Sequence, residues 1–196
     1  MSTRRLRVCC VCASNQNRSM EAHRELAQRG YASVRSYGTG SSVKLPGRTA
    51  MDPVIFPFNM PYEQMRAELQ SRDAALYTAN GVLAMLDRNA MIKQAPEQWR
   101  DARERFDVII TFEDRVFRAV VDDFVSNRAP SVFAPGYVIN LEVKDTHAAA
   151  AEGAKLAVEL VEEIDKCENI DAYIYDVIAK LEAKHGQQIM AVPVFC

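Results

Sequence analysis

The sequence predicts an α/β fold: a doubly wound, mostly parallel sheet flanked by helices, with an inserted helical cap. Short apolar runs alternate with amphipathic helical patterns along most of the chain, which is typical of β–α–β units. The first run, residues 6–11, is apolar without alternation, as in a central parallel strand that is covered on both faces. The chain has 196 residues and is 48% hydrophobic, enough for one domain over 1–196 with a substantial core.

The remaining elements follow the same reasoning in chain order. Further strands are expected at 34–37, 107–112, 137–143 and 188–195. Pro193 lies inside the last of these runs and should confine it to an edge of the sheet. Helices are expected at Arg18–Gln28, 96–105, 113–124, 145–166 and 170–184. Gly30 should end the first helix, and Trp99 should lie on the buried side of the polar helix at 96–105.

Residues 44–95 are the least periodic part of the chain and interrupt the strand–helix alternation. They begin with an irregular apolar arm, followed by helical spacing of apolar residues at 62–76 and 80–91. We expect this block to cover the loop end of the sheet as a substrate-binding cap, because insertions at that end usually select substrate.

Composition excludes several classes of function. A net charge of −2 and a pI near 6.0 argue against direct nucleic-acid binding. There is no apolar stretch of transmembrane length, and MSTRRLR is too short and polar for a signal peptide, so no membrane association is expected. The 5 cysteines are odd in number and lack zinc-type spacing, which favours a reduced intracellular compartment and no metal.

The stretch LRVCCVCASNQNRSM, which joins the first strand to the first helix, carries the most specific pattern. Cys12 ends the strand, and five residues separate it from Arg18. The amides of such a loop and of the first helical turn converge on anions. Positive charge beside a thiol favours the nucleophilic thiolate, and a guanidinium matches two oxygens of a phosphate. The pattern predicts a phosphate-binding loop with a cysteine nucleophile.

The residues expected to bind phosphate are Ala13, Ser14, Asn15, Gln16, Asn17 and Arg18. Asn15 and Asn17 are the types that best tolerate the left-handed backbone that such a cradle needs. Ser19 is expected to donate a hydrogen bond that steadies the thiolate. The alternative, a buried structural cysteine beside a surface arginine, leaves the polar run SNQN unexplained.

A thiolate that displaces an alcohol from phosphorus needs an acid, because an alkoxide is a very poor leaving group. In doubly wound folds the ligand lies beyond the carboxyl ends of the strands. The acidic residues there are Glu113, Asp114, Glu142 and Asp145. We expect Glu113 and Asp114 to cap the next helix, and Glu142 to point into a helix or solvent. Asp145 begins a loop that reaches over the first strand, and its rival role is a helix N-cap.

Several motifs carry a resemblance: CASNQNRSMEAH, SYGTG, VKLPG, YTANG and MLDRN. From residue 8 to about 172 the chain resembles the phosphatases of the RNA polymerase II C-terminal domain. That family is itself similar to low-molecular-weight tyrosine phosphatases with an added cap. The resemblance implies that Cys12 is the nucleophile, Arg18 the phosphate clamp and Ser19 the partner of the thiolate.

The segment VINLEVKDTH resembles the family segment that carries the general acid, and Asp145 occupies the acid's position. Glu142 and Thr146 stand where the family has Asp and Asn. The resemblance implies a nuclear enzyme without cofactor that removes phosphate from serine in the heptad repeats of the polymerase tail. It also implies association with the mRNA 3′-end processing machinery through a symplekin-type scaffold.

A phosphoserine is short, so its peptide must bend to lower the phosphate into a deep loop. In the heptad repeats this serine precedes a proline, and the resemblance implies that a cis Ser–Pro bond makes the bend. The residues expected to form the groove for it are Lys44, Pro46, Tyr77, Met85 and Leu86. Packing inside the cap is the alternative role of each.

Other functions remain open at this point. An arsenate reductase would need two further redox cysteines near the site, and none lies between Cys12 and Cys167. A phosphotyrosine phosphatase of the low-molecular-weight type uses the same loop. A third alternative is a mainly structural binding module of the processing complex. The presence of a reactive thiol, an arginine clamp and an acid together argues against it, because binding alone does not require them.

Overall fold

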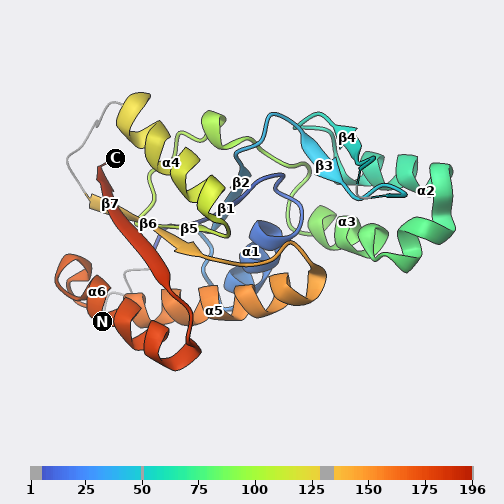
Figure 1. The fold of residues 1–196 in the computed structure, drawn as a ribbon. Coiled ribbons are helices and arrows are strands. Elements are labelled where there is room, and N and C mark those ends of the chain that lie inside the picture. The colour runs from blue at the N-terminus through green and yellow to red at the C-terminus, as the bar shows by residue number, and fades with distance from the viewer. Residues whose placement is uncertain (1–5, 50, 129–134, 196) are drawn as a thin grey trace.

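The computed structural model describes residues 6–49, 51–128 and 135–195. Its centre is a five-stranded sheet of order β2-β1-β5-β6-β7 (Figure 1). The strands are β1 (Val8–Cys12), β2 (Arg35–Gly38), β5 (Val108–Thr111), β6 (Pro135–Leu141) and β7 (Ile189–Phe195). The first four pair in parallel, and β7 runs antiparallel to β6. The predicted α/β class with a mostly parallel sheet is confirmed.

Helices cover both faces of this sheet, as Figure 1 shows. One face carries α1 (Arg18–Gln28), α5 (His147–Asp165) and α6 (Ile170–His185), and the other carries α4 (Asp114–Ser126). Side chains alternate along a strand, so Cys10 and Cys12 belong to the apolar cluster under α1 and α5. Cys9 and Val11 belong to the cluster under α4. All of β1 is therefore buried, which explains its uninterrupted apolar sequence.

The expected helix at 96–105 is wrong. Only Trp99–Asp101 forms a short 3-10 helix, between extended residues Gln98 and Ala102. The preceding backbone instead pairs with the end of β2, where Gly38 donates its N–H to the carbonyl of Glu97 at 2.9 Å. This tertiary pairing prevailed over the expected polar helix, and Trp99 still reaches the core from a loop.

The last strand lies at the edge of the sheet, as Pro193 predicted, and the structure determines its direction. Two helices, α5 and α6, separate β6 from β7, and they are joined by a short link. Lys180 and Lys184 of α6 pair with Glu163 and Glu159 of α5 and hold the two helices side by side. A second helix reverses the chain once more, so β7 returns antiparallel.

The block between β2 and β5 contains α2 (Tyr62–Ala79) and α3 (Val82–Ala90), which match the two expected helices. It also contains a hairpin of β3 (Val43–Leu45) and β4 (Val54–Phe56), which was not expected because its strands are too short to show alternation. The block has its own buried apolar cluster, joined by Met20 of α1. Figure 1 places it beyond one end of the sheet, beside α1 and the start of α5. In the described part of the chain, no helix has both the length and the apolar character needed to cross a membrane.

Candidate active site

A cavity of about 240 Å³ lies where the loop after β1, the inserted block and the loop after β6 meet. Each of these segments contributes side chains to its wall. The lining residues are Cys12, Ser14, Gln16, Asn17, Lys44, Leu45, Pro46, Asn80, Val82, Met85, Asp145, Thr146 and His147. The nucleophile and the acid that the sequence predicts, far apart in the chain, therefore face one cavity.

Cys12 lies at the floor of this cavity with 3% of its surface exposed. Its Sγ is 3.0 Å from the Oγ of Ser19 on the first turn of α1. Asn15 donates its Nδ2–H to the same Oγ at 3.0 Å. A thiolate has no proton to donate, so with Cys12 in that form the Ser19 hydroxyl is the donor of this contact while its oxygen accepts from Asn15. The arrangement stabilises negative charge on the sulfur of Cys12.

The two asparagines of the loop behave differently. Asn15 adopts the left-handed backbone with a φ of 52°, as predicted, and its Oδ1 accepts the N–H of Glu97 at 3.0 Å. The same prediction is wrong for Asn17, whose φ is −106°. Asn17 acts instead through its side chain, which donates from Nδ2 to Oδ1 of Asp145 at 3.0 Å.

The guanidinium of Arg18 is held on one side by three acceptors. Its Nη1 donates to the carbonyls of Phe112 and Val143 at 3.2 and 3.0 Å and to Oε2 of Glu113 at 3.1 Å. Its Nη2 lies 3.4 Å from Oδ2 of Asp145, and its buried Nε has no hydrogen-bond partner among the described residues. The edge formed by Nε and Nη2 is the fork that matches two oxygens of a phosphate.

The charge of Arg18 is secured by its surroundings. Burial by itself would lower the pKa of this guanidinium, but the neighbouring Cys12, Asp145 and Glu113 together raise it. The pKa of Glu113 is lowered, because hydrogen bonds and charge from Arg115 and Arg18 outweigh the opposing effect of burial. Arg18 and Glu113 therefore form a charged pair beside the cavity.

The structure distinguishes the four acidic candidates. Glu113 stands at the N-cap position of α4 but makes no capping hydrogen bond with its side chain, so its expected capping role is wrong. Glu142 accepts the backbone N–H of Asp114 at 3.1 Å and so lies against the start of α4. Asp114 itself pairs with Arg118 on its own helix. None of these three residues lines the cavity.

Asp145 remains as the acid at the cavity. The N-cap of α5 is Thr146, whose Oγ1 accepts the N–H of Ala149 at 3.2 Å, so the rival capping role falls to its neighbour. The side chain of Asp145 is 60% exposed and is oriented by Arg18 and Asn17. It is therefore open to solvent while it is held over the loop.

The five residues expected to form the substrate groove separate into two groups. Lys44, Pro46 and Met85 line the cavity. Tyr77 and Leu86 do not line it and are buried in the apolar cluster of the inserted block, to which Met85 also belongs. Adjacent residues on a helix point about 100° apart, so Met85 and Leu86 cannot both face the cavity. Tyr77 and Leu86 are therefore packing residues.

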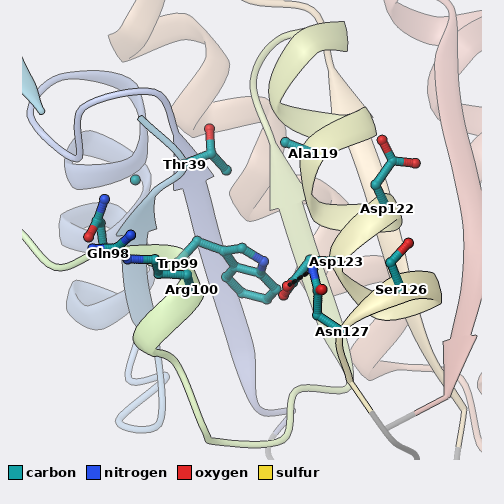
Figure 2. Close-up of a pocket in the computed structure, with 10 residues that line it drawn as sticks. Thr39, Gln98, Trp99, Arg100, Ala119, Asp122, Asp123, Ser126 and Asn127 are labelled. Carbon is teal, nitrogen blue, oxygen red and sulfur yellow. Dashed lines mark hydrogen bonds between the residues drawn. The ribbon is translucent and has the colours of Figure 1, made fainter. Parts of the chain in front are cut away.

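A second cavity of about 250 Å³ lies between the loop at Trp99 and helix α4. Figure 2 shows Trp99 in its centre, with Thr39 on one side and Asp122 and Ser126 of α4 on the other. The backbone N–H of Thr39 donates to the carbonyl of Cys12 at 3.0 Å, so this wall supports the loop from behind. The second cavity is similar in volume but contains neither the thiol of Cys12 nor a carboxylate that contacts Arg18, so volume alone does not identify the site.

Sequence reasoning missed several residues around the loop. Glu113 was assigned to capping, and no pattern in the sequence pointed to its pairing with Arg18. Tyr62, Arg88 and Asn89 of the inserted block hydrogen-bond to the loop backbone. Arg88 and Asn89 belong to the motif MLDRN, and all three are polar side chains within apolar helical stripes, but neither signal indicated a contact with the loop. Among the described residues no group of three or more His, Cys, Asp or Glu side chains is arranged to hold a metal ion.

Comparison with known proteins agrees with this architecture. The family model described as Ssu72-like protein matches residues 6–195. The RNA polymerase II C-terminal domain phosphatase SSU72 of Bos taurus is 44% identical over 185 residues, which cover 94% of each chain. The protein of the same name from Schizosaccharomyces pombe is 40% identical over 181 residues, 92% of this chain and 91% of its own.

Among solved structures, a similar one is Drosophila melanogaster Ssu72 with Symplekin, bound to a cis peptidomimetic of a phosphoserine CTD peptide. It superimposes with a TM-score of 0.93 at 38% identity and covers 98% of this chain and 99% of its own. The family model and these relatives each span nearly the whole chain. The chain therefore belongs to the Ssu72-like protein family.

Proposed function

We propose that this chain is a cysteine-dependent phosphatase that removes phosphate from phosphoserine in the heptad repeats of the RNA polymerase II C-terminal domain. The observation that carries the proposal is that Cys12 and Asp145 line one cavity and that Arg18 lies 3.4 Å from Asp145 beside it. The relatives that bear the name of C-terminal domain phosphatase support the choice of substrate. In this proposal residues 44–95 form a substrate-binding cap on a single catalytic domain.

The reaction consists of two in-line transfers. Cys12 Sγ attacks phosphorus, the S–P bond forms, and the bond to the serine oxygen breaks while Asp145 protonates that oxygen. Asp145, now a carboxylate, takes a proton from water, which attacks phosphorus and breaks the S–P bond. Arg18 and the loop amides stabilise the equatorial oxygens in both steps, where most of the transition-state charge lies.

The substrate enters the cavity past Lys44, Pro46 and Met85, which come from the inserted block. In this proposal the peptide bends at a cis Ser–Pro bond so that the short phosphoserine reaches the floor of the loop. The relative crystallised with a cis peptidomimetic of a phosphoserine peptide supports this geometry. The same relative, held with Symplekin, supports a symplekin-type scaffold as partner and a nuclear location for this chain.

The deciding experiment measures phosphate release from heptad peptides that each carry a single phosphoserine, with and without orthovanadate. A phosphotyrosine peptide of matched length serves as the comparison. The proposal expects vanadate-sensitive turnover of a phosphoserine peptide. Efficient turnover of phosphotyrosine alone would assign the chain to the low-molecular-weight tyrosine phosphatase type, and no turnover of any peptide would leave a binding module.

A further inference from the structure

The phosphate loop is anchored by the inserted block through its carbonyls. In a trans peptide the carbonyl of one residue and the N–H of the next point in opposite directions. A hydrogen bond to the carbonyl of Asn15 therefore orients the N–H of Gln16, and one to the carbonyl of Gln16 orients the N–H of Asn17. Neither of these two N–H groups has an acceptor among the described residues. They are donors that remain available to an anion.

Two side chains of α3 bind the carbonyl of Gln16. Arg88 donates from Nη2 at 2.7 Å, and Asn89 donates from Nδ2 at 2.9 Å. The Nε of Arg88 also donates to Oδ1 of Asn89 at 3.0 Å, so the two side chains hold each other in place. Both lone pairs of the Gln16 carbonyl are thus occupied by donors from the inserted block.

Arg88 is itself fixed by a buried ion pair. Its Nη1 lies 2.5 Å from Oε2 of Glu21 on α1, with 15% of the Arg88 side chain and 10% of the Glu21 side chain exposed. The guanidinium therefore connects α3 to both the phosphate loop and the helix that follows it. A buried guanidinium without its carboxylate partner would strongly destabilise the folded protein. The ion pair with Glu21 therefore keeps the side chain of Arg88 in this position.

Tyr62, on the first turn of α2, binds the preceding carbonyl of the loop, that of Asn15. Its hydroxyl donates to the carbonyl of Asn15 at 2.8 Å, and the residue is fully buried. Burial first, and then the charge of Cys12, raise the pKa of this phenol well above its ordinary value. The hydroxyl therefore remains a proton donor throughout the physiological range.

We propose that Tyr62, Arg88 and Asn89 are positioning residues for catalysis, which hold the carbonyls of the loop outward so that its amides face the phosphate. The inference deepens the proposed function and rests on the assignment of the loop as a phosphate site. It gives the inserted block a second role, because a substrate too small to touch the groove still depends on the loop amides. A block that only selects peptides would leave such substrates unaffected.

The test uses Tyr62→Phe and Arg88→Lys in the full chain. The first removes one hydroxyl with little change of shape, and the second keeps a positive charge beside Glu21 but loses the planar fork. Tyr137→Phe is the matched control for the phenol, because its hydroxyl donates to Asp171 at 2.8 Å outside the inserted block. Arg72→Lys is the control for the arginine, because Arg72 pairs with Glu68 on the same α2 helix and does not contact the loop.

Three quantities are measured for each variant: kcat/KM on p-nitrophenyl phosphate, the Kd of orthovanadate by calorimetry, and the midpoint of thermal unfolding. Tyr62→Phe and Arg88→Lys should each lower kcat/KM by about 10- to 100-fold and weaken vanadate binding in parallel, since small displacements of a catalytic group are costly. Both controls should retain wild-type values on the small substrate and for vanadate. If Tyr62→Phe and Tyr137→Phe lower the unfolding midpoint by similar amounts but only Tyr62→Phe loses activity, the loss of activity is due to positioning and not to stability.

Wild-type kcat/KM on p-nitrophenyl phosphate together with wild-type vanadate affinity in Tyr62→Phe would overturn the proposal. So would a loss confined to phosphoserine peptides, which would assign these residues to the substrate groove. If Arg88→Lys does not fold, Tyr62→Phe alone decides. Because vanadate binding is measured without turnover, the positioning role is tested even if the wild-type chain fails to hydrolyse phosphoserine.

Discussion

Nη2 of Arg18 lies 3.4 Å from Oδ2 of Asp145, so the proposed phosphate clamp also pairs with the proposed acid. A phosphate that takes the Nε–Nη2 edge of Arg18 competes directly with this carboxylate. Among the described residues, the side chain of Asp145 then keeps the hydrogen bond from Asn17, at 3.0 Å. In the proposed mechanism, binding of the dianion and presentation of the acid are therefore coupled through one guanidinium.

The first prediction concerns the nucleophile. Cys12→Ser should keep the fold and the affinity for phosphate but abolish turnover, because a hydroxyl has no comparable fraction of anion at pH 7. Phosphate release from a phosphoserine peptide and vanadate binding by calorimetry measure the two properties. Cys167→Ser, a partly exposed cysteine far from the loop in sequence, is the matched control and should remain active. Residual turnover above about a per cent of wild type would contradict the assignment of Cys12.

The second prediction concerns the acid. Asp145→Asn should lower turnover of phosphoserine by about 10² to 10⁴, the usual contribution of general acid catalysis. On an aryl phosphate with a good leaving group the first transfer should lose much less, because that oxygen needs little protonation. Burst-phase kinetics on both substrates separate formation of the phosphocysteine from its hydrolysis. Glu142→Gln is the control, because Glu142 contacts the start of α4 and does not line the cavity.

If Asp145→Asn slows the burst phase equally on both substrates, the carboxylate has a structural role and does not protonate the leaving group. If instead the steady-state rate falls equally on both substrates and the burst phase is unchanged, hydrolysis of the phosphocysteine limits turnover.

The third prediction concerns the shape of the substrate. The cis form makes up about 10–30% of such bonds in free peptides, so selecting it weakens apparent binding by about 3- to 10-fold. A peptide locked in the cis geometry should bind tighter by that factor, and a trans-locked peptide should be inert. With enzyme in excess, a prolyl isomerase should accelerate the slow phase of phosphate release, because uncatalysed exchange takes tens of seconds. Dephosphorylation of the trans-locked peptide at the rate of the flexible one would exclude cis selection.

The fourth prediction concerns the stability of α1 toward acid. Nδ1 of His23 lies 2.9 Å from Oγ of Ser36. Burial, followed by the charges of Lys93 and Arg35, lowers the pKa of His23 from 6.5 to about 4. The unfolded chain therefore binds a proton more readily than the folded chain, and stability is lost as the pH falls from 6.5 to about 4.

The loss from this one group is at most about 3–4 kcal/mol, because each unit of pKa difference corresponds to about 1.4 kcal/mol. Urea unfolding of wild type and of His23→Gln at several pH values measures it. The variant should show a shallower decline of unfolding free energy over this window, whatever its stability at neutral pH. Parallel declines in the two proteins would contradict the assignment.

The sequence by itself determined the features that depend on near neighbours. The apolar run before Cys12 and the five-residue spacing to Arg18 define a strand, a loop and a helix start, and a left-handed Asn15 follows from the same short stretch. Helical periodicity located α2 and α3, and Pro193 located the edge strand. Each of these signals lies within a few residues of the feature that it predicts.

Only the tertiary structure decided which distant groups meet. Glu113 reaches Arg18 across 95 positions of sequence. Asp145 was expected at the loop, but its contact with Arg18 across 127 positions was not. The same holds for the hydroxyl of Tyr62 on the loop carbonyl, and for the pairing of Gly38 with Glu97 that replaced a helix. Local propensity amounts to tenths of a kcal/mol per residue, whereas a buried polar group without a partner costs about 1–3 kcal/mol. The need to pair buried polar groups in the folded chain therefore determined these contacts. The periodicity of a short segment carries no information about a partner that is many residues away in the sequence.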